Sequence, residues 1–318
     1  MTNRRQFCMG LAASPLLATA AGSAFAQERR QLTMVVPYPP GGSADILGRL
    51  FSNALSTELN EKIIVENRAG AGGTLGASYV AGMPADGRTM LYTLGNLLLN
   101  QEFLLKEVRF RPMESLAPVG RTGIVQVVII AKADHPASNL REFIAMAKRN
   151  PGKHSFAYYG DLGIPAMAAE AGIDILRVPY KGGAPALIDT ASGIVDILAS
   201  SLAQALPLIR AGKVKVLAVS SEERLADMPN VATVKEIVPG YKSIDYMGVF
   251  VPKATPRPVI DQLWQATSRV LANPDFQRAA GERGVLVRPM GPDQLNTAME
   301  VEYANTRKTV RTAGILPE

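Results

Sequence analysis

The sequence predicts an α/β protein of two domains, in which parallel sheets are covered by helices on both faces. Apolar, strand-like runs alternate with segments of helical periodicity along the chain, and this order favours parallel sheets. The length of 318 residues corresponds to two domains of about 150 residues each. Two similar apolar segments, at residues 126–133 and 247–254, separate the middle of the chain from its ends.

The first third of the chain predicts three strands and two helices. Strands are expected at Leu32–Pro37, Lys62–Glu66 and Thr89–Thr93, and helices at Asp45–Leu59 and Gly76–Gly82. In the longer helix, apolar residues at positions 46, 47, 50, 54 and 55 recur with the spacing of one helix face. Strand, helix, strand, helix, strand is the order of parallel βαβ units.

The alternation continues through the middle of the chain. Ser138 is expected to cap a helix that carries apolar residues at positions 140, 143, 144 and 147, and Pro151-Gly152 ends this helix. Further strands are expected at Ser155–Tyr158, Ile175–Pro179, Val195–Ser200 and Lys215–Ser220, with helical stretches between them.

The two similar segments are apolar strands that each run into a turn containing proline. Residues 126–133 precede Asp134-His135-Pro136, and residues 247–254 precede Thr255-Pro256. Strands that leave one domain and return from another have this form, and the stretch between them has the size of a domain. The predicted domains are residues 27–123 with 247–318, and residues 124–246. The alternative is two core strands within one large domain.

Composition excludes several classes of protein. Apolar residues make up 47% and charged residues 19% of the chain, which indicates a folded protein. A single cysteine excludes a disulfide framework and a cysteine-based zinc or iron–sulfur site. Two isolated histidines argue against a histidine-ligated metal and against a serine–histidine relay. We therefore expect no metal, no cofactor and no catalytic residue.

Residues 1–26 are predicted to be an export signal. Arg4 and Arg5 form a positive start, residues 8–21 are weakly apolar, and Ala24-Phe25-Ala26 is a cleavage site of small residues. The apolar stretch is shorter than the roughly 20 residues that span a bilayer. Residues 3–7 also fit a twin-arginine signal, with the general secretory route as the alternative. Cleavage after Ala26 predicts a periplasmic protein; an ordinary first helix would need an amphipathic pattern that is not visible.

Removal of the signal leaves a mildly basic chain. Residues 1–26 contain two arginines and no acidic residue, so the formal charge falls from +6 to +4. Cys8 is removed as well, and a chain without thiols suits an oxidising compartment. No stripe of Lys and Arg with interleaved aromatic residues is visible. This charge pattern favours small anionic ligands and gives no support for nucleic acid.

Glycine-rich turns follow the strand-like runs at three places. In the first, Pro37–Asp45, Gly41 and Gly42 let a ligand approach the backbone, and Ser43 is expected to cap the next helix. Unpaired amides at a helix start attract anions, so this turn suits a carboxylate or a phosphate. The alternative is a tight turn without a ligand. The lysine-containing consensus of a P-loop is absent.

The other two turns are less specific. Residues 66–76 resemble a dinucleotide-binding fingerprint but fail it, because Leu75 stands where the third glycine is required. A second nest of exposed backbone amides is the better interpretation. In residues 178–185, Pro185 suits a first helical turn, and Lys181 is either a surface charge or a cation at a cleft.

These motifs occur together in a recognisable order. They are Val36-Pro37 with residues 41–45, Val65–Arg68 with residues 70–73, Asp86-Gly87, Ala117–Val119, Val178–Gly182, Ala211–Lys213 with Leu217–Val219, and Pro252 with Thr255-Pro256. In this combination the chain resembles the Bug family of periplasmic solute-binding proteins, which serve tripartite tricarboxylate transporters. The resemblance covers nearly the whole chain after residue 26.

The resemblance implies a two-lobed type II periplasmic binding protein fold with two crossing hinge strands, as in a Venus flytrap. It implies a small carboxylate ligand: a dicarboxylate, an acidic amino acid or an aromatic carboxylate. The expected partners are the membrane subunits of a tripartite tricarboxylate transporter, or a sensor protein. We expect the protein itself to be a monomer.

The binding residues of the family map onto turns of this chain. The loop matching Pro37–Asp45 takes one ligand carboxylate, largely through backbone groups and ordered water, and the facing lobe contributes loops matching residues 158–163 and 200–204. The predicted ligand-binding residues are Tyr38, Gly41, Gly42, Ser43, Asp45, Gly72, Thr74, Asn96, Tyr158, Tyr159, Gly160, Tyr180, Lys181, Ser200, Ser201 and Gln204.

The chain departs from the family pattern after the strand at residues 155–158. A loop bearing serine, glycine and histidine is replaced by one that contains Tyr158, Tyr159, Gly160 and Asp161. Tyrosines add stacking surface and phenolic donors, and Asp161 opposes a second ligand carboxylate if it points inward. We therefore expect an aromatic or amphipathic monocarboxylate. The alternative is that both tyrosines pack between the lobes.

The primary interpretation is a binding protein that makes and breaks no bond. A ligand that touches both lobes favours their closed form, with the crossing strands as the hinge. The first alternative is a ligand sensor that acts with a sensor kinase. The second is an exported hydrolase, but His135 and His154 lie in no recognisable triad and the G-x-S-x-G motif is absent.

Overall fold

The computed structural model describes residues 31–104, 110–221, 223–241 and 245–312. The chain from residue 31 onward forms one compact unit. The predicted export signal at residues 1–26 lies outside the described residues and stays a prediction. None of the helices in the described part of the chain has the length and apolar character needed to cross a membrane.

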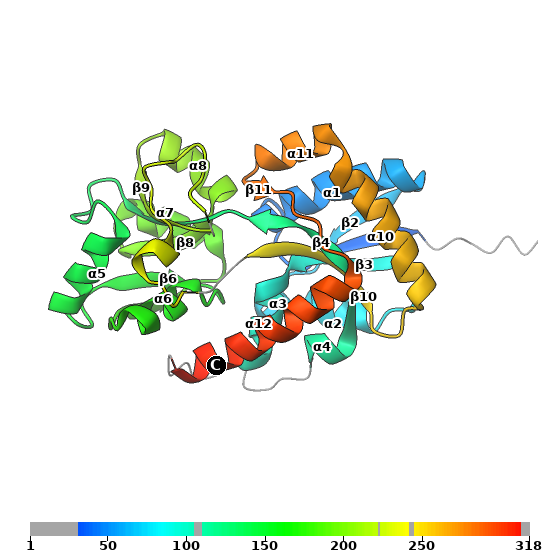
Figure 1. Cartoon of the computed structure of the whole chain (residues 1–318), viewed down its shortest axis with the longest axis horizontal. Coiled ribbons are helices and arrows are strands. Elements are labelled where there is room, and N and C mark those ends of the chain that lie inside the picture. The colour runs from blue at the N-terminus through cyan, green and yellow to red at the C-terminus, as the bar shows by residue number, and fades with distance from the viewer. Residues whose placement is uncertain (1–30, 105–109, 222, 242–244, 313–318) are drawn as a thin grey trace, which may run out of the picture. The chain divides into compact units, whose positions relative to one another are not determined.

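The strands form two sheets (Figure 1). The six-stranded sheet has the order β11-β4-β10-β3-β1-β2. Its members are β1 (Leu32–Val36), β2 (Ile63–Asn67), β3 (Thr89–Leu94), β4 (Leu116–Val125), β10 (Tyr246–Pro252) and β11 (Val285–Leu286). The five-stranded sheet has the order β7-β6-β8-β5-β9. Its members are β5 (Val127–Lys132), β6 (Ser155–Tyr158), β7 (Leu176–Pro179), β8 (Ile197–Ser201) and β9 (Val214–Ser220).

Both sheets are mixed, so the prediction of parallel sheets is only partly right. β1 is parallel to β2 and β3, and β6 is parallel to β7 and β8. β10 is antiparallel to β3 and β4, and β5 is antiparallel to β8 and β9. Parallel neighbours need a crossover connection within one sheet. β5 and β10 instead enter their sheets directly from the other part of the fold, which lets them run the opposite way.

Helices cover both faces of the six-stranded sheet (Figure 1). One face carries α1 (Ser43–Leu59), α10 (Arg257–Ala272) and α11 (Pro274–Gly281); the other carries α2 (Thr74–Ala81), α3 (Gly95–Leu104), α4 (Pro112–Ser115) and α12 (Pro292–Thr312). Successive side chains of β1 point to opposite faces of the sheet, so this strand contributes to the core on each face. Met34 and Val36 pack in the core with Phe51 of α1, while Val35 packs in a second core with Val80 of α2.

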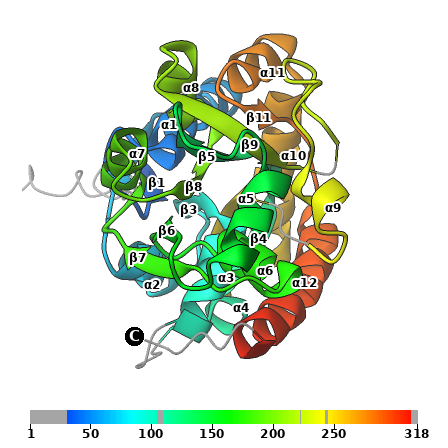
Figure 2. The ribbon, with the colours of Figure 1, turned by 90° about the vertical axis from the view of Figure 1, so that its left-hand side faces the viewer.

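The five-stranded sheet is covered in the same way (Figure 2). The helices α5 (Leu140–Arg149), α6 (Gly163–Ala171) and α9 (Val234–Ile237) contribute to one core, and α7 (Gly183–Ser192) and α8 (Leu202–Arg210) contribute to the other. Along β5, Ile129 faces the first core, whereas Val128 and Ile130 face the second. A strand buried on both faces reads as a continuous apolar run, which is the pattern of residues 127–131.

The chain passes between the two sheets at two adjacent places. Gln126 alone separates β4 from β5; its N–H donates to the Gly284 carbonyl at 2.9 Å, and its carbonyl accepts from Leu202 N–H at 2.7 Å. On the return, the Tyr241 hydroxyl still bonds with Ser220 at the end of β9, whereas the Asp245 carbonyl accepts from Val125 N–H of β4 at 2.7 Å. Residues 242–244 lie outside the described residues. The segments at 126–133 and 247–254, predicted to leave and return, each belong almost wholly to one sheet. The domain limits at residues 124 and 246 stay a prediction.

Two predicted helix caps are wrong by one residue. α5 is capped by Asn139, whose side chain accepts from Glu142 N–H at 3.0 Å, whereas Ser138 N–H donates to the Glu142 carboxylate at 2.7 Å. Gly42, not Ser43, is the N-cap of α1, and it provides no side-chain bond. In both cases the extended residue directly before the first helical φ/ψ takes the cap position.

Candidate ligand-binding site

A cavity with a volume of about 480 Å3 is lined by residues from both sheets and from the passages between them. The predicted site residues on its wall are Tyr38, Gly41, Gly42, Ser43, Gly72, Asn96, Tyr159, Lys181, Ser200, Ser201 and Gln204. The wall also includes residues that the sequence analysis did not select, among them Leu97, Val125, Val127, Asp161, residues 182–185 and Asp245. Five predicted residues lie off the wall: Asp45, Thr74, Tyr158, Gly160 and Tyr180.

The first glycine-rich turn is shaped from behind by Asp45. Its carboxylate accepts from Gly41 N–H at 2.9 Å, from Asn67 Nδ2 at 3.0 Å, and pairs with Arg49 at 3.0 Å. Burial alone would raise the pKa of Asp45, but these bonds outweigh burial and lower it. Asp45 therefore stays charged and holds the turn in place from outside the cavity, whereas residues 38–44 form the wall.

Three helix N-termini contribute to the cavity wall. Gly42 precedes α1, Gly182 precedes α7, and Ser201 caps α8 by accepting from Gln204 N–H at 3.4 Å. The starts of α7 and α8 adjoin, because a Cβ on Gly183 would lie 2.7 Å from Gln204 Oε1. First-turn amides have no intrahelical partner and carry partial positive charge. This part of the wall is therefore suited to an anion.

Gly72 of the second glycine-rich turn and Gly160 of the loop after β6 make room for a buried glutamine. Gln101 is 6% exposed; a Cβ on Gly72 would lie 2.2 Å from its Oε1, and a Cβ on Gly160 would lie 3.3 Å from its Nε2. Both glycines have positive φ, +63° and +102°. Gly160 therefore has a packing role and does not line the cavity. Thr74, another predicted site residue, is the first residue of α2 and also lies off the wall.

Only one of the paired tyrosines reaches the cavity. Tyr158 is 7% exposed and packs in the core, edge to face with Phe156. Tyr159 is on the wall, with its hydroxyl donating to the Ala199 carbonyl at 3.0 Å. Tyr180 donates to Asp189 at 2.7 Å and so ties the end of β7 to α7. Alternation along an extended chain explains why neighbours 158 and 159 face opposite ways.

Tyr38 completes the phenolic part of the wall. Its hydroxyl accepts a long hydrogen bond from Thr93 Oγ1, at 3.4 Å. Burial raises the pKa of Tyr38 to about 12, opposed by the bond from Thr93 and supported by the Asp245 charge. Burial likewise raises the pKa of Tyr159. Both phenols therefore remain neutral donors at physiological pH.

The cavity wall contains two carboxyl groups, Asp161 and Asp245, that are not among the predicted binding residues. The sequence suggests Asp161 only as a charge that would oppose a ligand carboxylate, and it gives no reason to select Asp245, which is 9% exposed. Asn96 Nδ2 donates to Asp245, and Gly163 N–H donates to Asp161 at 2.8 Å. Asp161 does line the cavity, as the sequence interpretation had considered. The only sequence signal for Asp245 is a lone acid directly before an apolar strand, which is too common to select a site.

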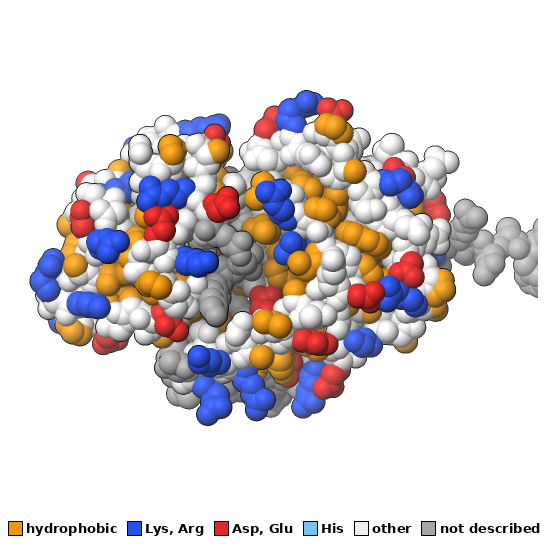
Figure 3. All heavy atoms as spheres, viewed as in Figure 1, with side chains coloured by type: hydrophobic (Ala, Val, Ile, Leu, Met, Phe, Trp, Pro, Cys, Tyr) orange, Lys and Arg blue, Asp and Glu red, His pale blue; other side chains and the backbone are white. Residues whose placement is uncertain are grey.

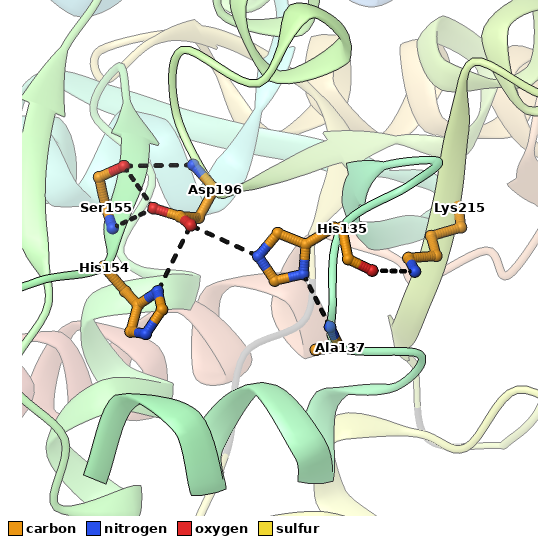
Figure 4. A network of polar contacts seen from close by, with 6 residues as sticks. All are labelled: His135, Ala137, His154, Ser155, Asp196 and Lys215. Atoms are coloured by element: carbon orange, nitrogen blue, oxygen red, sulfur yellow. Dashed lines mark hydrogen bonds and ion pairs between the residues drawn. The ribbon is translucent and has the colours of Figure 1, made fainter. Parts of the chain in front are cut away.

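The two histidines lie in a separate polar network (Figure 4). Asp196 accepts from Ser155 N–H and Oγ, at 2.8 and 2.9 Å, and lies 3.4 Å from both His135 Nε2 and His154 Nδ1. These contacts outweigh burial and lower the pKa of Asp196. Asp196 precedes β8, whose opposite end carries Ser200 and Ser201 of the cavity. The network joins three turns of the chain, and Ser155 bonds to the carboxylate, not to an imidazole.

A second cavity of about 430 Å3 lies along α12 and shares Asn96 with the first. It contains none of the glycine-rich turns. No group of side chains suited to hold a metal ion is found among the described residues. On the face shown in Figure 3, acidic and basic side chains are interspersed, so this face has no extended field of one sign.

Comparison with known proteins identifies relatives along nearly the whole chain. Residues 47–315 match the family described as tripartite tricarboxylate transporter family receptor. A protein of Pseudomonas sp. strain P51, named for the tcbD-tcbE intergenic region, is 32% identical and is aligned over 96% of this chain and 94% of its own length.

Two solved structures show the same fold. The periplasmic binding protein BugD is 30% identical, with a TM-score of 0.81 and coverage of 91% of this chain and 99% of its own. Rpa4515 of R. palustris, solved with adipate, is 28% identical, with a TM-score of 0.84 and coverage of 91% and 98%. The expected two-lobed periplasmic binding protein fold and the resemblance to Bug proteins are confirmed. The chain belongs to the family of tripartite tricarboxylate transporter receptors.

Proposed function

We propose that this chain is an exported, periplasmic solute-binding protein, which captures a small carboxylate in the cavity between its sheets and delivers it to the membrane subunits of a tripartite transporter. The observation that carries the proposal is the convergence of the N-termini of α1, α7 and α8 on one cavity. Their free amides stabilise a carboxylate without a cationic side chain. The adipate bound by Rpa4515 is a ligand of the same class.

Binding and closure are coupled in this proposal. The anion-binding amides come from α1 in one part of the fold and from α7 and α8 in the other. A ligand that bonds to both sets has a higher affinity for the closed arrangement, and only this difference can shift the balance between open and closed forms. The protein acts as a receptor that returns its ligand unchanged.

A thermal-melting screen tests the binding function. The panel contains aliphatic and aromatic monocarboxylates, dicarboxylates and amino carboxylates. A ligand present at 100 times its Kd stabilises the folded state by about 2.7 kcal/mol, which raises the melting temperature. Mass spectrometry of the mixture should show the ligand intact. Consumption of a ligand at catalytic protein concentrations would contradict the proposal and favour an enzyme.

A pair of variants at Gly42 tests the place of binding. Gly42 has φ −77°, and a Cβ there would meet only the Pro39 carbonyl, at an ordinary 3.5 Å. Gly42→Ala should therefore fold and bind nearly as the native protein does. Gly42→Trp should fold but lose binding, because the indole fills the space before the α1 amides. Undiminished affinity of Gly42→Trp in calorimetry would remove this turn from the site.

Export and partnership have separate tests. Protein recovered from the periplasm should have the mass of a chain that begins at Gln27 and should elute as a monomer. Cells that lack the gene should fail to take up the ligand found in the melting screen. Normal uptake with a lost transcriptional response would instead support the sensor alternative.

A further inference from the structure

Three polar groups of the cavity wall form an acceptor cluster: the carboxyl groups of Asp161 and Asp245 and the side-chain oxygen of Asn96. Asp245 and Asn96 are 9% and 5% exposed, and all three residues line the cavity. Asn96 donates through Nδ2 to Asp245, which leaves its Oδ1 buried without a hydrogen-bond partner among the described residues. An unpartnered buried acceptor is costly, so this oxygen marks a place where a donor is missing.

Among the described residues, the wall of this cavity supplies one cation, and Arg121 and Lys235 line the second cavity, which shares Asn96. Lys181 is the one cationic side chain among the described residues of the wall, and it is exposed. Burial raises the pKa of Asp245, and the charges of Asp161 and Glu302 raise it further. Burial also raises the pKa of Asp161. The other titratable groups near the cluster are the neutral phenols of Tyr38 and Tyr159 and the carboxyl group of Glu302, whose pKa burial raises to about 7. The Tyr241 hydroxyl lies beside Asp161, since both would contact a Cβ on Gly163.

Without a ligand, the form of the carboxyl pair that keeps one proton is therefore favoured over the doubly ionised form. Two buried carboxylates close together do not both ionise without a compensating positive charge. A second ligand carboxylate would add a third negative charge here. A ligand ammonium would add the missing charge, and its three N–H donors match the three acceptors.

We propose that Asp161, Asp245 and Asn96 bind a protonated amino group, so that the ligand is an amino carboxylate. This inference rests on the proposed function, because the ligand carboxylate occupies the N-termini of α1, α7 and α8. The ammonium arrives already protonated and keeps its protons. The proton held by the Asp161–Asp245 pair leaves for the solvent as the pair ionises, so binding releases protons and weakens as the pH falls.

Matched ligands test the inference. γ-Aminobutyrate is paired with glutarate, and δ-aminovalerate with adipate. The two molecules of each pair have chains of equal length, and the first carries an ammonium where the second carries a carboxylate. A panel of such pairs, extended to α-amino carboxylates, is titrated into the native protein by calorimetry at pH 7. At least one amino carboxylate should bind about tenfold more tightly than its dicarboxylate partner, which corresponds to about 1.4 kcal/mol. Repeating the titration in buffers of different ionisation enthalpy should show proton release.

The outcomes separate this inference from the proposed function. If dicarboxylates bind and no amino carboxylate binds better, the amino-group site is wrong and the carboxylate receptor stands. If no carboxylate of either class binds, both are wrong. Tight binding of an amino carboxylate without proton release would contradict the claim that the ligand-free carboxyl pair holds a proton.

Isosteric variants test whether Asp161 and Asp245 cause the preference for an amino carboxylate. Asp245→Asn keeps an acceptor for Asn96, and Asp161→Asn keeps an acceptor for Gly163 N–H. Each should lower the affinity for the amino carboxylate at least tenfold, reduce the proton release, and leave dicarboxylate affinity equal or improved. Asp227→Asn, an exposed position away from the wall, is the matched control and should change nothing. Equal losses for both ligand classes would mean that the two acids only maintain the shape of the wall.

Discussion

At the scale of the residue, Gly72 shows how a binding turn depends on close packing. Its φ is +63°, and a Cβ would lie 2.2 Å from Gln101 Oε1. Gly212 has the same φ, but a Cβ there would have no neighbour within 4 Å. Comparing alanine substitutions at the two glycines therefore separates the cost of backbone strain, which both share, from the cost of steric overlap, which only Gly72 has.

We expect Gly72→Ala to destabilise the protein more than Gly212→Ala. Both variants carry the strain of a left-handed residue, about 1 kcal/mol, and overlap with Gln101 adds about 1–3 kcal/mol to the first. Urea denaturation measures both free energies of unfolding. Gly72→Ala combined with Gln101→Ala should recover part of the difference; no recovery would mean that another contact limits the site.

Tyr159 is the aromatic residue that the loop after β6 contributes to the cavity. Tyr159→Ala should weaken binding of aromatic carboxylates more than of aliphatic ones, because stacking surface is lost only for the former. Tyr158→Ala should instead lower the melting temperature, because that side chain is in the core. Equal losses of both ligand classes in Tyr159→Ala would refute a stacking role.

At the scale of the element, α5 tests which residue begins a helix. The Asn139 side chain accepts from Glu142 N–H and so caps the helix, whereas Ser138 bonds only to the Glu142 carboxylate, through its backbone N–H and its hydroxyl, and caps no backbone amide. Loss of an N-cap costs about 0.5–2 kcal/mol. A side chain that makes no capping bond should be replaceable at almost no cost.

Asn139→Ala should therefore lower the free energy of unfolding by about 1 kcal/mol, and Ser138→Ala should leave it nearly unchanged. Both positions are exposed, so neither substitution opens a cavity in the core. Chemical denaturation compares the two variants with the native protein. A larger cost for Ser138→Ala would reverse the cap assignment.

At the scale of the whole molecule, two acids make the stability of the fold depend on pH in opposite directions. Asp196 has a lowered pKa in the folded state, so its contribution is present above its unfolded value of about 4 and is lost as the pH falls through the folded pKa. Asp245 has a raised pKa. Its neutral form favours folding, and this contribution is lost as the pH rises from about 4 toward the folded pKa.

Melting temperatures measured from pH 2 to pH 8 should separate the two acids, because the Asp196 contribution is lost only below about pH 4. Asp196→Asn should melt lower than the native protein at neutral pH, and the gap should narrow in acid. Asp245→Asn should melt higher than the ligand-free native protein at neutral pH, and this advantage should vanish toward pH 4. Because Asp196 lies off the cavity wall, its variant should bind ligand normally. Parallel pH profiles for all three proteins would show that neither acid is linked to folding.

The sequence alone determined most strands and helices, the family and the fold, because hydrophobic periodicity and turn residues are local properties of the chain. It also located the first glycine-rich turn and most of one side of the cavity, since motif order carries that information.

Only the tertiary structure decided the directions of β5 and β10, the inward position of Tyr159 but not Tyr158, and the carboxyl pair. Asn96 and Asp245 are 149 positions apart. Whether two such residues meet depends on where the chain passes between the sheets, and no local pattern records that passage.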